Sequence, residues 1–153
     1  MKKLFGYAGR ILDINLGARN GAGGMTGAAS VEPLDPQDAM RYIGGRGLNV
    51  ARLVREIDLD VDPLSPENVL LVGVGPLDGT LFPGAARVNF TSKSPQTGIL
   101  GDSNAGGFFG PELKFAGYDQ VIIRGRAARL SYLFISDDGV QLLPAEDLAG
   151  LDV

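Results

Sequence analysis

The sequence predicts an α+β fold that is rich in β-strands, with mostly antiparallel sheets and two or three short helices. Several short segments alternate apolar with polar residues or run continuously apolar, whereas helical spacing is confined to brief stretches. Glycine supplies 23 of the 153 residues, about twice its usual share of roughly 7%. This glycine content favours turns and close backbone approaches over long helices.

The first part of the chain predicts a hairpin with a long connection. Residues 10–16 alternate apolar and polar side chains, as a half-buried strand does. Residues 17–30 are mainly glycine and alanine without periodicity, so we expect a flexible insertion there. Residues 31–34 then form a short returning strand.

Two adjacent helices follow. Asp35 is an N-cap residue and Pro36 suits the first helical position, which predicts a helix ending near Ile43, before two glycines. Residues 48–57 place apolar side chains at helical spacing and predict a second helix. A third short helix is predicted between Pro111 and Gly117.

The remaining regular segments are strands. Residues 68–74 are almost continuously apolar, which indicates a central strand buried on both faces. Residues 87–93 alternate again, with arginine, asparagine, threonine and lysine on the polar side. Further strands are predicted at 120–125, 132–136 and 140–143, the last two joined by a hairpin turn at Asp138 and Gly139.

Composition excludes several classes of protein. The net charge of −4 does not attract nucleic acid. The chain has no cysteine and no histidine, which removes thiolate-bound iron–sulfur clusters, structural zinc and imidazole bases. No apolar run approaches the roughly 20 residues of a membrane span, and no secretory signal is recognisable. We therefore expect a cytoplasmic protein without membrane or nucleic-acid partners.

The stretch with the clearest functional signal is residues 98–110, which contains five glycines and precedes the third helix. Successive backbone N–H groups in such a segment can form a concave site for phosphate. The alternative is an ordinary tight loop. No βαβ unit surrounds the stretch, so a dinucleotide-binding site is not expected.

Polar residues near this stretch have two interpretations each. Arg87 and Lys93 could clamp a phosphate or lie on a solvated strand face. Ser103 and Asn104 could contact a heterocycle or a hydrated cation, or could cap a turn. Arg46, in a glycine-rich junction, could supply a second anion contact or belong to a corner between helices.

Several strings occur in the order, and nearly at the spacing, of one known family: GYAGR at 6–10, GGRGL at 44–48, DPLSPEN at 62–68, GPL at 75–77, KSP at 93–95 and the run at 102–119. Together they resemble the amino-terminal domain of the tungsten-containing aldehyde:ferredoxin oxidoreductase family. The likeness covers the whole chain apart from residues 17–30. The strings SPEN and FGPELKFAGYD are its most specific parts.

The resemblance implies a site for a bis-pyranopterin tungsten or molybdenum cofactor. The position matching Arg87 contacts the pterin phosphate in that family. The position matching Asn104 lies against the cofactor, and its backbone carbonyl binds a Mg²⁺ ion that bridges two phosphates. Further residues are expected to line the cofactor, namely Arg46, Lys93, Ser103, Ala105, Gly106 and Gly107.

The resemblance also limits what these residues can do alone. In that family the cysteines of the 4Fe-4S cluster and the catalytic acid–base residues lie in later domains, so residues 1–153 match only the first part of the first domain. We therefore expect a metal–pterin-binding part of an enzyme that oxidises aldehydes to carboxylic acids, not catalytic by itself.

Expected partners are the remaining domains or a second subunit carrying the cluster, with ferredoxin for the intact enzyme. A homo-oligomer is also expected. The alternative is a stand-alone binding or scaffold module that self-associates.

Overall fold

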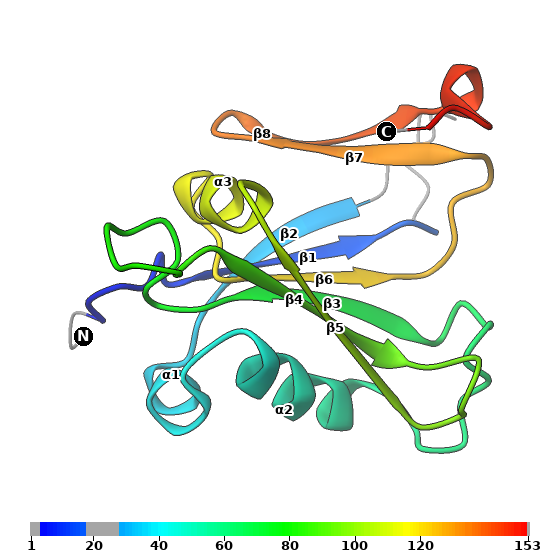
Figure 1. The fold of residues 1–153 in the computed structure, drawn as a ribbon. Coiled ribbons are helices and arrows are strands. Elements are labelled where there is room, and N and C mark those ends of the chain that lie inside the picture. Colours follow the sequence, from blue (N-terminus) through cyan, green and yellow to red (C-terminus); the bar gives the residue numbers. More distant parts are fainter. Residues whose placement is uncertain (1–3, 18–27, 153) are drawn as a thin grey trace.

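Six strands form one mixed sheet, in the order β2-β1-β6-β3-β4-β5, within the residues that the computed structural model describes, 4–17 and 28–152 (Figure 1). These strands are β1 (Arg10–Asn15), β2 (Ala28–Pro33), β3 (Val69–Val74), β4 (Arg87–Lys93), β5 (Leu100–Gly106) and β6 (Gln120–Arg124). A separate hairpin consists of β7 (Ser131–Ser136) and β8 (Gly139–Pro144). The helical segments are α1 (Pro36–Tyr42), α2 (Arg46–Glu56), α3 (Phe109–Phe115) and a 3-10 turn, Glu146–Leu148.

The sheet lies between two covering layers (Figure 1). Helices α1 and α2 cover one face, where Leu48 and Leu53 pack in a cluster with Leu71 and Ile122. Helix α3 and the β7–β8 hairpin cover the other face, over a second cluster that includes Val72, Val88, Leu113 and Val121. The fold is thus α+β, as the sequence predicts.

Strand β3 is central, between β6 and β4, which agrees with its continuous apolar run. Every pairing in the sheet is antiparallel except one. Strand β1 runs parallel to β6, with Ile11 opposite Gln120. Among the described residues, no helix is both long enough and apolar enough to cross a membrane.

The parallel pair is fastened by Asp119, a fully buried residue just before β6. Its carboxylate accepts hydrogen bonds from the backbone N–H of Ala8 at 3.1 Å and of Gly9 at 2.6 Å. The ammonium of Lys114, on α3, forms an ion pair with the same carboxylate. The segment that leads into β1 is therefore tied to the chain between α3 and β6.

Two boundaries differ from the predicted ones. The glycine-rich stretch is not a loop throughout, because residues 100–106 form β5 and pair with β4 along its whole length. The pairing partner supplies the order that this sequence of small polar residues does not encode locally. Strand β2 begins at Ala28, so residues 28–30 of the predicted insertion pair with β1. Residues 18–27 of that insertion lie outside the described residues.

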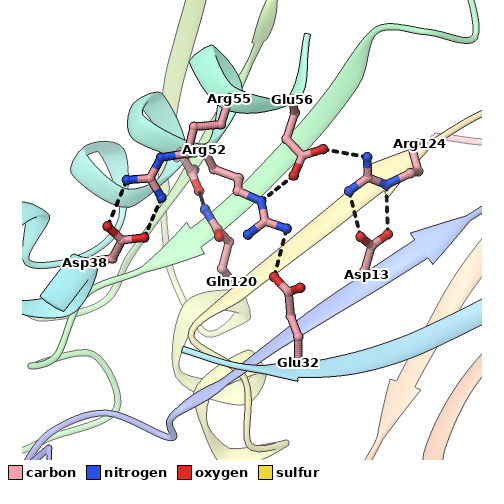
Figure 2. A network of polar contacts seen from close by, with 9 residues as sticks. Asp13, Glu32, Asp38, Arg52, Arg55, Glu56, Gln120 and Arg124 are labelled. Atoms are coloured by element: carbon pink, nitrogen blue, oxygen red, sulfur yellow. Dashed lines mark hydrogen bonds and ion pairs between the residues drawn. The ribbon is translucent and has the colours of Figure 1, made fainter. Parts of the chain in front are cut away.

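An ion-pair network joins α2 to the other end of the sheet (Figure 2). Arg124 on β6 donates twice to Asp13 on β1, at 2.9 and 2.6 Å, and once to Glu56 on α2, at 2.7 Å. Arg52 on α2 lies 2.6 Å from Glu56 and 2.8 Å from Glu32 on β2. Three strands and a helix thus share one chain of alternating charges.

The network lowers the pKa of Glu56. Burial raises this pKa, but the hydrogen bond from Arg124 and the positive charges of Arg52 and Arg124 outweigh burial, so the net shift is downward. A carboxyl group with a lower pKa in the folded state stabilises the fold above its unfolded pKa. That contribution is lost as pH falls through the folded pKa.

We expect Glu56→Gln to lower the free energy of unfolding by about 1–2 kcal/mol near neutral pH, between the values for exposed and buried ion pairs. The difference from wild type should begin to shrink below the ordinary pKa of 4.5, where Glu56 of the unfolded chain becomes protonated, and should be lost as pH falls through the lower pKa of the folded state. Urea unfolding near neutral pH and near pH 3 measures both effects. A matched control is Glu146→Gln, since Glu146 lies 3.6 Å from Arg129 with both side chains half exposed. A difference for Glu56→Gln that is equal at both pH values would contradict the assignment.

Candidate functional site

The candidate site lies on the α2 side of β4 and β5, where the register brings the expected residues together. Arg87 is opposite Gly106 and Asn89 is opposite Asn104. Opposite residues of an antiparallel pair project from the same face. The Asn89 side chain contacts Asn49 of α2, which identifies that face. We call the surface formed by Arg87, Asn104 and Gly106 the β5 face.

Arg87 is exposed at the first position of β4. Every other basic side chain among the described residues makes a hydrogen bond, an ion pair or a ring contact, whereas that of Arg87 makes none. A guanidinium offers a planar fork of donors that matches the oxygens of a phosphate or carboxylate. The β5 face therefore presents an unused anion-binding group beside a glycine.

Arg46 also lies at this end of α2, but it is engaged. Its guanidinium lies 2.7 Å from the carboxylate of Asp102 on β5. The glycines around it serve the corner between α1, α2 and β3, because a Cβ at Gly44 would lie 2.9 Å from the carbonyl oxygen of Val74 and one at Gly47 would lie 2.1 Å from that of Tyr42. The helix-corner interpretation of these glycines fits this geometry.

Three other expected side chains point elsewhere. The ammonium of Lys93 donates to the carbonyl oxygens of Leu59 at 2.5 Å and Val61 at 2.7 Å, at the opposite end of β4 from Arg87. Ser103 and Ala105 are opposite Phe90 and Val88, so their side chains project toward the α3 side of the sheet. The structure thus brings Arg46, Arg87, Asn104 and Gly106 to one side and separates Lys93 from them.

The backbone requires glycine at only one of the two positions at the end of β5, Gly106 and Gly107. Gly107 has a φ of 116°, a conformation that other residues rarely adopt. Gly106 has no positive φ, and a Cβ there would meet only the carbonyl oxygen of Ala86, at 3.9 Å. The chain itself does not require glycine at 106. An open surface without a side chain beside a free arginine fits a bulky anionic ligand lying on the strand.

A hollow of about 320 Å³ adjoins Arg87, lined partly by Ile43, Asp78 and Phe82. Ile43 has a φ of 67°, which is strained for a branched residue, and its carbonyl accepts a 2.6 Å hydrogen bond from the Tyr7 hydroxyl. Burial raises the pKa of Asp78, although Lys114 and nearby backbone N–H groups act in the other direction. Strain and a buried carboxyl beside the arginine are typical of a functional surface.

Sequence reasoning missed a chain of buried amides beneath the β5 face, which we call the amide relay: Gln120, Asn49 and Asn89. The amide nitrogen of Gln120 donates to Asn49 Oδ1 at 2.8 Å, and the amide nitrogen of Asn49 donates to Asn89 Oδ1 at 2.9 Å. All three residues are at most 2% exposed. The available signal was a polar residue, Asn49, among the apolar positions of α2.

These features define an α+β domain with an exposed, unpaired arginine side chain beside a glycine at the edge of its sheet. A model of the family described as aldehyde ferredoxin oxidoreductase, N-terminal domain, matches residues 11–153. The tungsten-containing aldehyde ferredoxin oxidoreductase of Pyrococcus furiosus is 41% identical over 150 residues, which cover 98% of this chain and 24% of that protein. The enzyme of the same name from Thermococcus kodakarensis is 41% identical over 147 residues, covering 96% and 23%.

The fold also matches part of a solved structure. The active site complex BamBC of benzoyl coenzyme A reductase, in complex with 1,5-dienoyl-CoA, superposes with a TM-score of 0.88 at 37% identity, over 95% of this chain and 21% of that chain. The chain belongs to the aldehyde ferredoxin oxidoreductase family and matches its N-terminal domain. It spans about a quarter of the length of the relatives described above.

We expect Gly73→Ala to destabilise the fold by about 1–3 kcal/mol, the usual cost of overpacking a core. A Cβ at Gly73 would lie 2.5 Å from Asn49 Oδ1 and would push Asn49 out of the amide relay. The control is Gly75→Ala, because nothing lies within 4 Å of a Cβ at that position. Thermal and urea unfolding of the two variants provide the measurement. If Gly73→Ala and Gly75→Ala are equally stable, Asn49 can leave the amide relay without lowering the free energy of unfolding, and the prediction is wrong.

Proposed function

We propose that this chain forms part of the binding site for a metal–pterin cofactor, tungsten or molybdenum held by pyranopterins, in an oxidoreductase that converts aldehydes to carboxylic acids. The observation that carries the proposal is the free guanidinium of Arg87 beside Gly106 on the β5 face. The family match supports a tungsten cofactor as the ligand, since curated relatives are named as tungsten-containing enzymes. A phosphate-bearing, bulky ligand fits both the free cation and the open surface.

Each residue of the β5 face has a distinct task in this proposal. Arg87 binds the pterin phosphate through two N–H groups. Asn104 offers its backbone carbonyl to a Mg²⁺ ion associated with the phosphates, since Mg²⁺ prefers oxygen ligands. Gly106 and Gly107 leave room for the ligand against the strand. The backbone of Ser103 and Ala105 belongs to the same surface, while Lys93 holds the 59–61 segment.

The chemistry itself comes from outside these residues. When bound, the metal–pterin supplies the oxidation and reduction, and the protein supplies binding and orientation. The chain contains no cysteine or histidine, so ligands for a 4Fe-4S cluster would come from other domains or a second subunit. We propose ferredoxin as the electron acceptor of the intact enzyme, and cytoplasm as its location. By itself the chain would not oxidise aldehydes.

Exposed apolar side chains before β4 and after β5 in the sequence support a covering protein surface. Leu81, Phe82 and Phe108 are at least 60% exposed, and Phe82 lines the hollow next to Arg87. Exposed apolar surface beside a site is typical of interaction surfaces. We propose that another domain, a subunit or a second copy of the chain covers it. A self-associating binding module without catalysis remains the alternative function.

The direct test replaces Arg87 and measures affinity for metal-free pyranopterin monophosphate by calorimetry. Arg87→Ala should weaken binding by about 1.5–3 kcal/mol, the range for a hydrogen bond to a charged group. Arg87→Lys should recover only part, because a point charge does not reproduce a two-pronged contact. Arg126→Ala is the control, since that arginine donates to the carbonyl of Leu64. Equal affinity of wild type and folded Arg87→Ala would rule out the phosphate contact.

A second test uses the open space at Gly106. Gly106→Ala and Gly106→Val should leave the free energy of unfolding within about 1 kcal/mol of wild type, because the added Cβ meets only one atom, at 3.9 Å. Affinity for the same pterin should fall in steps as the side chain grows, since each carbon occupies the ligand's place. Unfolding by urea and calorimetric titration separate the two effects. A Gly106→Val variant that binds like wild type would place the ligand elsewhere.

A further inference from the structure

Asn89 holds three consecutive residues of β5 with one side-chain amide. Its Nδ2 donates to Asp102 Oδ1 at 2.6 Å, to the carbonyl oxygen of Ser103 at 3.1 Å and to Asn104 Oδ1 at 3.3 Å. Asn89 is 2% exposed, whereas residues 102–106 are exposed. A buried group therefore fixes an exposed strand from beneath.

The other end of the same side chain is also saturated. Asn89 Oδ1 accepts from Asn49 Nδ2 at 2.9 Å and from the Thr91 hydroxyl at 2.8 Å. Asn49 Nδ2 also donates to the backbone carbonyl of Asn89 at 3.1 Å. The side chain of Asn89 is thus held from α2 and from its own strand, which leaves it no freedom to follow β5 if that strand moves.

The chemistry of the neighbours sets the direction of these hydrogen bonds. A backbone carbonyl and an ionised carboxylate only accept, so Ser103 and Asp102 require the NH₂ group of Asn89 to face β5. The oxygen of Asn89 then faces Asn49, whose NH₂ group must point to it. Asn49 Oδ1 is left for the NH₂ group of Gln120. Every amide of the relay therefore donates in the same direction, from Gln120 on β6 through Asn49 and Asn89 to β5.

Strand β5 depends on this contact more than an inner strand would. It is the last strand of the sheet and, within the described residues, has a strand partner on one side only. Its backbone ladder with β4 fixes the register but not the side chain of Asn104. Asn89 is the group that reaches from the core to that side chain.

We infer that Asn89 is a positioning residue, which holds β5 and Asn104 in the geometry that receives the cofactor. The identity of the ligand in this inference rests on the proposed function. The claim that Asn89 holds β5 in place does not. Asn89 lies under the strand and acts through Asp102, Ser103 and Asn104. It is not expected to touch the ligand.

The test is Asn89→Asp, which keeps the size of the side chain and replaces the donor with an acceptor facing Asp102 and the carbonyl of Ser103. Two readouts are compared with wild type: hydrogen exchange of the backbone amides of 102–106, and affinity for metal-free pyranopterin monophosphate. Exchange in β5 should rise about tenfold or more while β1 and β6 stay protected, and affinity should fall about tenfold. Thr91→Val, which removes only the 2.8 Å hydrogen bond to Asn89 Oδ1, is a milder variant with smaller changes in the same direction.

A matched control separates positioning from loss of stability. The amide of Asn68 donates to the carbonyl oxygens of Pro63 at 2.8 Å and Lys93 at 3.0 Å, away from the β5 face. Asn68→Asp makes the same donor-to-acceptor change there and should leave both the exchange of 102–106 and pterin affinity near wild type. If Asn68→Asp changes the two readouts as much as Asn89→Asp does, the positioning role is overturned.

Rescue gives the decisive result. Adding Asp102→Asn to Asn89→Asp returns a donor to the contact, now from β5 to β4, and should restore most of the protection and the affinity. Asp102→Asn alone should keep β5 protected, because its amide oxygen still accepts from Asn89, and it measures separately the loss of the ion pair between Asp102 and Arg46. A double variant no better than Asn89→Asp would overturn the proposal. If wild type binds no pterin, the proposed function fails, and the exchange data still decide whether Asn89 holds β5.

Discussion

The structure depends on satisfying a set of amides buried between α2 and the sheet. An unpaired amide in that place would cost more than most single contacts contribute, so the side chains of Gln120, Asn49 and Asn89 have to meet. Their meeting sets how closely α2 approaches β3, where Gly73 leaves room for Asn49. It also sets where β5 lies. The apolar clusters provide most of the driving force for folding, whereas the amides select one arrangement of the helix over the strands.

The distribution of charge over the described residues explains how an acidic chain can keep one exposed arginine unpaired. With a net charge of −4, the molecule as a whole repels anions. Its basic side chains are mostly occupied by carboxylates, carbonyls or aromatic rings, as Arg46, Lys93 and Arg124 illustrate. Arg87 differs because, within the described residues, its guanidinium makes no such contact. Arg87 is therefore distinguished from the other basic side chains in this part of the chain because those are paired within the protein. Among these same residues, it does not belong to a cluster of positive charges.

Much of the fold was predictable from local pattern, and the candidate site was predictable in part. The apolar run of β3 and the alternation of β4 predicted these strands correctly. The place of Arg87 beside the glycine-rich stretch made it a candidate, and its role stays a prediction. Strand β5 was not predicted, because serine, asparagine, aspartate and glycine have low strand propensity and only pairing with β4 orders them. The alternating pattern of β4 did not predict that Asn89 is buried. Asn89 is buried because it packs against Asn49, which lies 40 residues earlier in the sequence.

The parallel pairing of β1 with β6 has a consequence for the order of folding. Strands β3, β4 and β5 are neighbours in both sequence and space, so they can pair as soon as they are made. Strand β1 meets Asp119 and Arg124 across 110 and 111 residues, from Gly9 and Asp13. Closing so long a loop carries an entropic cost that local pairing avoids. We therefore expect the β1–β2 hairpin to join the sheet after β3, β4 and β5 have paired with one another.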